Sequence, residues 1–238
     1  MKSFIILISL FTIFAHAEDK TFKGESEASA LIINGNVNSE SYSAKTMNTY
    51  AVSEMDLASI FGRYIRSVAS GLENAKAWEA GLRYERIFTK DLLSGFVQHK
   101  AEHDPYNGIF IQRDSTDIGV KYYFAKNDVL EWVGELGPRI QNTYIDSTLP
   151  RDVTVFVRMF TQADYKVSAT TSTRLWVEHL ANLKNPSQYQ TNAELSLAVA
   201  MNNIFSLKTA YLFKRDESIV ASLKKDSSTW TTALVAKY

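Results

Sequence analysis

The C-terminal stretch "STWTTALVAKY", residues 228–238, alternates between two kinds of side chain. Every second residue back from the end belongs to a mainly apolar set: Tyr238, Ala236, Leu234, Thr232 and Trp230. A repeat of two residues is that of a β-strand whose two faces meet different surroundings. Most domains end in a few loosely held polar residues, whereas this chain ends on an aromatic ring. The stretch therefore predicts a final strand that is built into a sheet up to its last residue.

Four stretches upstream show the same alternation, each with one apolar and one charged face. They are "KAWEAGLRYERIF" at 76–88, "RDSTDIGVKYYF" at 113–124, "VLEWVGELGPRI" at 129–140 and "RDVTVFVRMF" at 151–160. Less regular segments complete the series at 24–34, 41–52, 57–69, 92–101, 171–181, 189–200 and 204–214. Together with the terminal strand, they predict an all-β chain of about twelve strands.

The segments between these strands alternate in length. Long ones, such as "SGLENAK" (70–76) and "HKAEHDPYNGIFIQR" (99–113), alternate with short ones, such as "SEMD" (53–56) and "TKD" (89–91). In a closed antiparallel meander, odd and even connections lie at opposite ends. Outer-membrane barrels have short turns at the periplasmic end and longer loops at the other end. The pattern predicts a single antiparallel up-and-down transmembrane β-barrel with both termini at the short-turn end.

The first residues predict export. Lys2 precedes the apolar run 4–14, and "AHA" at 15–17 has the small residues of a secretory cleavage site. We therefore expect a signal peptide at 1–17 and an outer-membrane β-barrel domain at 18–238. The chain has no cysteine, so an exported domain must be stable without disulfides. Its net charge of zero argues against a nucleic-acid partner.

Alternation alone also fits a secreted soluble β-barrel, which would have its apolar face inward. Strands of about ten residues favour a membrane barrel, because that length spans the hydrocarbon layer when tilted. Aromatic residues at strand ends favour it too, since they resemble the interfacial girdles of such barrels. The girdle and assembly-signal candidates are Trp230, Leu234, Tyr238, Trp78, Phe88, Phe124 and Tyr165.

The charged face would then line a water-filled lumen, where ionised groups of both signs are tolerated and can pair. The lumen-facing candidates are Glu79, Arg83, Glu85, Asp117, Lys121, Glu131, Glu135, Arg139, Asp152, Arg158, Arg174, Glu178, Glu194 and Lys208. Twelve strands give a diameter between that of filled eight-stranded barrels and that of wide porins. We therefore predict a narrow lumen of mixed charge.

Three features carry a family resemblance: "GESEASALIINGNVNSESYSAKTMNTY" with Gly35-Asn36, "EWVGELGPRI" with Gly137-Pro138, and the aromatic terminus. With these features the chain resembles a domain-of-unknown-function family of salt-induced outer membrane proteins. Members of that family typically have Gly-Pro-Gly-Tyr where this chain has Gly-Pro-Arg-Ile at 137–140. The resemblance implies an outer-membrane β-barrel and brings no substrate, cofactor or catalytic residue with it.

Two groups of residues could suggest chemistry. His99, Glu102, His103 and Asp104 fall in the longest predicted loop, where Pro105 argues against the helical spacing that a metal site would need. His179 is next to Glu178 on a predicted strand, so the two side chains point to opposite faces. The sequence therefore assigns no catalytic, cofactor-binding or metal-binding residue.

The predicted function is an outer-membrane barrel that serves as a narrow channel or as a structural element of the envelope. A membrane-embedded enzyme barrel and a secreted soluble β-barrel are the alternatives. The expected partners are outer-membrane lipid and the export and barrel-assembly machinery. The sequence leaves the oligomeric state and any solute open.

Overall fold

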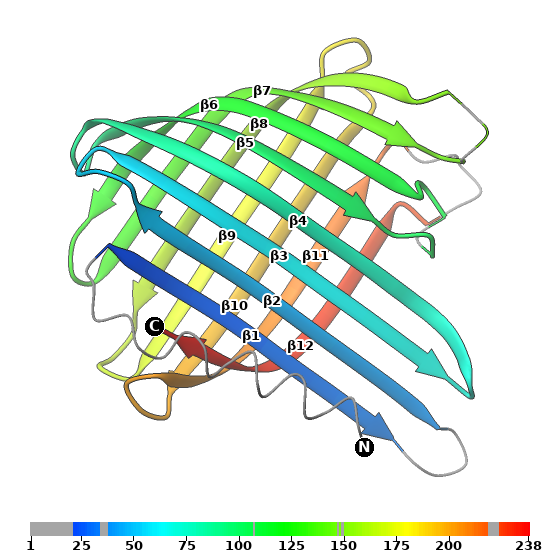
Figure 1. Cartoon of the computed structure of the whole chain (residues 1–238), viewed down its shortest axis with the longest axis horizontal. Helices are drawn as coiled ribbons and strands as arrows, with labels where there is room; N and C mark the ends of the chain where they lie inside the picture. The colour runs from blue at the N-terminus through cyan, green and yellow to red at the C-terminus, as the bar shows by residue number, and fades with distance from the viewer. Residues whose placement is uncertain (1–20, 34–37, 107, 147, 149, 219–223) are drawn as a thin grey trace.

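The computed structural model describes residues 21–33, 38–106, 108–146, 148, 150–218 and 224–238. The predicted signal peptide and Gly35-Asn36 lie outside these residues. Within them, twelve strands form one closed barrel in which each strand pairs with the next and the last pairs with the first (Figure 1). The strands are β1 (Phe22–Ile33), β2 (Ser39–Ala51), β3 (Asp56–Ala69), β4 (Leu72–Thr89), β5 (Leu93–His103), β6 (Gln112–Lys126), β7 (Leu130–Tyr144), β8 (Asp152–Lys166), β9 (Thr171–Asn182), β10 (Tyr189–Ala200), β11 (Phe205–Asp216) and β12 (Asp226–Lys237).

This architecture confirms the predicted all-β, up-and-down barrel. Every pairing in the barrel is antiparallel, as a meander requires. The strands run from 11 residues in β5 to 18 in β4, long enough to cross a hydrocarbon layer at a tilt. The described residues include no helix of the length and apolarity needed to cross a membrane.

The prediction was wrong about two connections. "SGLENAK" is not a long loop: β3 and β4 are joined by Ser70 and Gly71 alone, both with positive φ (51° and 80°). Two consecutive residues with positive φ form the tight turn that matches strand twist. The longest predicted loop is also shorter than expected, because β5 continues through His103. In both places the strands take up residues expected in loops.

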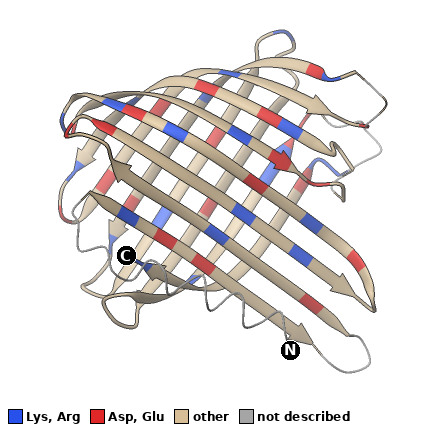
Figure 2. Cartoon of the chain, in the orientation of Figure 1, with Lys and Arg blue, Asp and Glu red and all other residues tan. Residues whose placement is uncertain are grey.

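The outer face of the barrel is apolar, and the inner face is polar. Large apolar side chains at alternate positions are exposed, among them Leu82, Ile118, Leu136 and Leu195. The residues that alternate with them along the strands and point inward, such as Asp117 and Arg139, are buried. Figure 2 shows Lys, Arg, Asp and Glu interspersed along the strands. An apolar exterior around a polar interior is the arrangement of a lipid-embedded barrel, and it excludes the soluble alternative, whose faces would be reversed.

The seam between β1 and β12 is the shortest pairing in the barrel. β1 pairs with β2 over its whole length, from Phe22 to Ile33, but with β12 only from Glu25 to Ala28. Two backbone hydrogen bonds between Gly24 and Tyr238, of 2.7 and 3.0 Å, extend the seam at the short-turn end. Toward the long-loop end the two strands part. Leu31 is 57% exposed there although it lies on the inner face.

Candidate functional site: a charged network across the lumen

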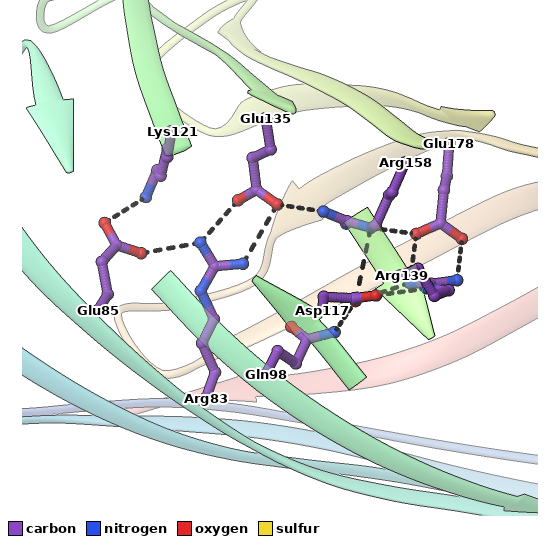
Figure 3. Close-up of polar contacts among 9 residues, drawn as sticks. All are labelled: Arg83, Glu85, Gln98, Asp117, Lys121, Glu135, Arg139, Arg158 and Glu178. Atoms are coloured by element: carbon purple, nitrogen blue, oxygen red, sulfur yellow. Dashed lines mark hydrogen bonds and ion pairs between the residues drawn. The ribbon is translucent and has the colours of Figure 1, made fainter. Parts of the chain in front are cut away.

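Eight charged side chains from β4 to β9 meet inside the barrel (Figure 3). We call them the lumen network: the cations Arg83, Lys121, Arg139 and Arg158 and the anions Glu85, Asp117, Glu135 and Glu178. Four positive and four negative charges make the network neutral. A neutral set of paired charges is the condition under which ionised groups are tolerated away from water.

Arg83 connects opposite parts of the network. Its guanidinium donates two hydrogen bonds to Glu135, of 2.8 and 3.2 Å, and a third of 3.0 Å to Glu85. Glu85 also accepts from Lys121 at 3.3 Å and from Ser94 at 2.7 Å. Since Arg83 is on β4 and Glu135 on β7, their pair bridges the two strands between them.

Arg139 and Arg158 form the other half. Arg139 donates to both oxygens of Asp117, at 2.5 and 2.8 Å, and to Glu178 at 3.0 Å. Arg158 donates to Glu178 at 2.6 Å and to Glu135 at 2.7 Å. Arg158 therefore joins the Arg139 half of the network to the Arg83 half. Each guanidinium has more than one carboxylate within reach, so partners can be exchanged without leaving a charge unpaired.

The network closes the middle of the lumen. Asp117 is 2% exposed and Arg139 3%, and Phe96 lies under the Arg83 guanidinium with its ring centre 3.9 Å away. Charged side chains this inaccessible leave little space for water between them. At the level of the network, the barrel interior is therefore filled rather than open.

The backbone next to Arg139 is shaped by Gly137 and Pro138. Pro138 has no N–H for the sheet, and the pairing of β6 with β7 has a gap opposite it, at Ile118 and Gly119, with the same register on both sides. A Cβ on Gly137 would lie 2.0 Å from the carbonyl oxygen of Ile118, so no other residue fits this close approach. The Gly-Pro pair noted in the sequence thus brings the two strands together where Asp117 and Arg139 pair.

A cavity lies at each end of the lumen network. The cavity toward the long loops has a volume of about 200 Å³ and is lined by Gln141, Asn182 and Gln190 among others. The cavity toward the short turns is smaller, about 50 Å³, and its lining includes Arg174 and Lys208. Along β8 and β9, the two cavities lie on either side of the network residues Arg158 and Glu178, and polar residues predominate in both linings.

The remaining predicted lumen residues lie outside the network, and several of them form ion pairs there. Glu79 accepts from Arg63 at 3.1 Å. Arg174 contacts Asp164 at 2.5 Å and Glu25 at 3.9 Å, and Lys208 contacts Glu27 at 2.8 Å and Glu194 at 3.5 Å. Glu131 lies opposite Lys126 and Asp164 in strand register. Asp152 lines the long-loop cavity.

Sequence reasoning missed several inner-face residues: Ser94, Gln98, Glu27 and Gln141. Ser94 and Gln98 bind Glu85 and Asp117, so they belong to the polar surroundings of the network. The sequence "SGFVQHK" could have revealed this inner face, because Ser94, Phe96 and Gln98 are alternate residues and so lie on the same side of the strand. Because Phe96 is apolar, the alternation of polar and apolar residues does not identify this side of the strand as polar.

The predicted girdle residues lie on the outer face. Trp78, Phe88, Phe124, Tyr165, Trp230 and Leu234 are all between 42% and 71% exposed. Phe88 and Phe124 each stand at a register shift and lie over a glycine of the neighbouring strand, Gly95 and Gly134 respectively. Aromatic rings that cover neighbouring glycines stabilise a sheet locally. Trp78 stacks on His103 toward the long-loop end, and Trp230 packs against Tyr211.

Tyr238 completes a polar cluster on the outer face of the seam. Its ring stacks on Phe22 at 6.0 Å and covers Gly24. Its hydroxyl contacts Ser26 at 2.9 Å and donates to Asn48 at 3.0 Å. Polar groups that face lipid must be satisfied within the protein, and Tyr238 does this for both partners.

The three described histidines lie on two strands, β5 and β9. His99 and His103 lie on β5 rather than in a loop, where His99 contacts Thr116 at 2.9 Å. His179 faces outward and contacts Thr191, while Glu178 faces the lumen network. Among the described residues, no three side chains of His, Cys, Asp or Glu are grouped as metal ligands.

An ion-pair cluster also connects the end of β11 to Lys225, just before β12, and its members Glu217 and Lys225 lie outside the strands. Lys225 donates to Glu217 at 2.5 Å, and the Arg215 guanidinium bonds the same carboxylate. These two hydrogen bonds hold the pKa of Glu217 below its ordinary value.

We expect this connection to loosen in acid. Because the pKa of Glu217 is lowered by folding, its contribution is complete above the ordinary glutamate pKa of about 4.3 and is lost as the pH falls further. Hydrogen exchange at the end of β11, corrected for its intrinsic pH dependence, should then increase. A Glu217→Gln variant should show the faster exchange at every pH. Equal protection of the natural chain at pH 7 and at pH 3 would contradict this expectation.

Known proteins share this architecture. No curated protein sequence is significantly similar to the chain. Among solved structures, the NanC porin has a TM-score of 0.51 at 8% identity, covering 91% of this chain and 97% of that one. The translocator domain of the autotransporter NalP from Neisseria meningitidis has a TM-score of 0.49 at 11% identity, covering 100% and 94%. The KdgM porin has 0.47 at 8% identity, covering 91% and 98%. At such identities, the likeness to NanC concerns the fold alone.

The sequence itself matches a protein family. Residues 26–238 match the family described as "Protein of unknown function, DUF481". The match covers eleven strands in full and most of β1, and it confirms the resemblance carried by the Gly-Pro pair and the aromatic terminus. The closed barrel, its apolar exterior and its polar lumen are those of an outer-membrane protein. The chain is an outer-membrane β-barrel and belongs to the DUF481 family.

Proposed function

We propose that the protein is a narrow channel for small polar solutes and ions whose lumen network acts as a gate. The observation that carries this proposal is the position of the network between two polar cavities. A barrel with a purely structural role has no need of charges at this level, since apolar residues of similar volume fill an interior at least as stably. Charged groups with interchangeable partners can instead move apart and admit water.

Replacing Arg83 by Ala is expected to increase conductance. The change removes the bridge between β4 and β7, yet each former partner keeps another: Glu135 retains Arg158, and Glu85 retains Lys121. The variant should therefore fold while its lumen widens. Purified protein in planar lipid bilayers should show small, infrequent steps for the natural chain and several-fold larger steps for Arg83→Ala.

Arg86→Ala is the matched control. Arg86 is on the same strand but pairs with Asp56 near the short-turn end, and its side chain is 52% exposed. Its removal should leave the conductance unchanged. If the natural chain and Arg83→Ala were both silent over a wide voltage range, the channel proposal would fail. A structural envelope barrel, which the inaccessibility of Asp117 and Arg139 favours, would then remain.

We also propose that β12 is the segment bound by the barrel-assembly machinery after export. The strand has Trp230 and Leu234 exposed on its outer face and leads into Tyr238, and its pairing with β1 is short. A short seam is readily left unpaired until the rest of the sheet has formed. We infer no enzymatic role, because Glu178 and His179 project from opposite faces of β9.

A further inference from the structure

The cavity at the long-loop end contains two buried amides without partners. Gln141 on β7 is 3% exposed, and Gln190 on β10 is 6% exposed. Both line the cavity, and neither makes a side-chain hydrogen bond to any residue in the described part of the chain. Their amide groups keep some accessible surface in the cavity, so water or a bound molecule can form hydrogen bonds with them.

Two further buried polar atoms near this cavity lack partners among the described residues. They are Nε of Arg113, which lines the cavity, and Oγ of Ser115, which lies next to Gln141 in the sheet register. A guanidinium N–H donates, a hydroxyl both donates and accepts, and each amide offers donors and acceptors. Both of these atoms are enclosed by protein, so a ligand can reach only the two amides, which fit a molecule that carries several groups able to donate and accept.

The cavity has no excess charge to favour an ion. Arg113 lies 3.6 Å from Asp216 and stacks on Phe110, so its charge is already opposed. Asp152 is the other charged residue of the lining. The rest is uncharged, and it includes Thr143 and Thr154 and the buried ring of Phe156. At about 200 Å³ the cavity is far larger than one water molecule requires.

We propose that this cavity binds one neutral sugar ring, with Gln141 and Gln190 as its hydrogen-bonding residues. Sugar hydroxyls donate and accept at once, as the amides do. The proposal concerns binding at the long-loop mouth. It stands apart from gating, because it can be measured in a barrel that does not conduct.

Binding can be tested on the full-length barrel in an amine-oxide detergent, which carries no sugar of its own. Ligand-observed NMR should detect contact with methyl α-D-glucopyranoside and N-acetyl-D-glucosamine, and weaker contact with D-glucuronate. Maltohexaose tests whether the site binds the end of a longer sugar chain. Binding of a single sugar or of maltohexaose supports the proposal. No contact with any neutral sugar, or a preference for glucuronate, would overturn it.

Methionine replacements test the two amides, because methionine resembles glutamine in shape and has no strong donor or acceptor. Gln141→Met and Gln190→Met should each weaken sugar binding about tenfold. Gln162→Met is the matched control, since Gln162 faces the lumen on the short-turn side of the network and donates a hydrogen bond of 2.6 Å to Asp164. It should bind sugar like the natural chain.

Stability separates a binding role from a structural one. Because the two amides lack protein partners, neither Met replacement should lower the urea midpoint of the sugar-free barrel. Unchanged sugar binding by both variants would overturn the proposal. So would a large loss of stability in both, which would mean that the amides serve the fold.

Discussion

Deleting Tyr238 is expected to lower the amount of folded barrel in the outer membrane by at least about tenfold. The residue supplies two backbone hydrogen bonds to Gly24, of 2.7 and 3.0 Å. Within lipid, each backbone group left unpaired costs several kcal/mol. Since β12 pairs with β1 over few residues, these two bonds are a large share of the seam.

The side chain of Tyr238 adds to this effect. Without its ring, Gly24 is uncovered and Phe22 loses its stacking partner. Without its hydroxyl, Ser26 and Asn48 lose a polar contact on the outer face. Tyr238→Phe keeps the ring and the backbone bonds, so its loss of assembly should be much smaller than that of the deletion.

Lys237→Ala is the control, and the readout is the heat-modifiable folded band in outer-membrane fractions. Lys237 pairs with Glu25 at 3.6 Å and is half exposed, so its side chain contributes little. The variant should assemble normally. Equal amounts of folded barrel with and without Tyr238 would refute both its structural role at the seam and its proposed role in recognition.

Replacing Arg139 by Met is expected to destabilise the barrel by about 3–5 kcal/mol, because a buried carboxylate loses its partner. Asp117 accepts two short hydrogen bonds from Arg139, whereas its next cation, Arg158, is 3.7 Å away. Glu178 keeps Arg158, so the deficit falls mainly on Asp117. Urea unfolding in lipid vesicles, followed by tryptophan fluorescence, would measure the loss.

A double variant shows whether charge or packing is responsible. Arg139→Met combined with Asp117→Asn restores neutrality and should recover much of the lost stability. Arg66→Met is the exposed counterpart: Arg66 pairs with Glu73 on the outside, and its loss should be barely detectable. If the double variant were as unstable as Arg139→Met alone, shape rather than charge would govern this site.

Alternation in the sequence predicted most of the fold. Each strand has lipid on one side and the polar lumen on the other, so every strand needs apolar and polar residues in alternation. "RDSTDIGVKYYF" is an example: Ile118, Val120, Tyr122 and Phe124 face outward, and Asp117 and Lys121 join the network. This requirement for alternating residues no longer holds where a strand leaves the membrane. The turn at Ser70-Gly71 and the extension of β5 to His103 therefore escaped prediction.

Alternation could also not predict which inner side chains meet. Arg83 and Glu135 are on strands that do not pair, so their contact depends on the tilt and stagger of the whole barrel. The partnerless state of Gln141 and Gln190 is equally a property of the assembled interior. A sequence gives the type of residue on each face, whereas closure of the sheet determines distances across it.

The short seam also bears on how the protein folds. Within the described chain, every pairing but one joins consecutive strands, so each can form as a local hairpin. The exception joins β1 to β12, where Ser26 and Tyr238 are 212 positions apart. Contacts between distant positions carry the entropy of closing a long loop and form slowly. Hairpin zippering should therefore produce an open sheet quickly, and the rate of barrel formation should be set by a single late encounter between the two ends of the chain.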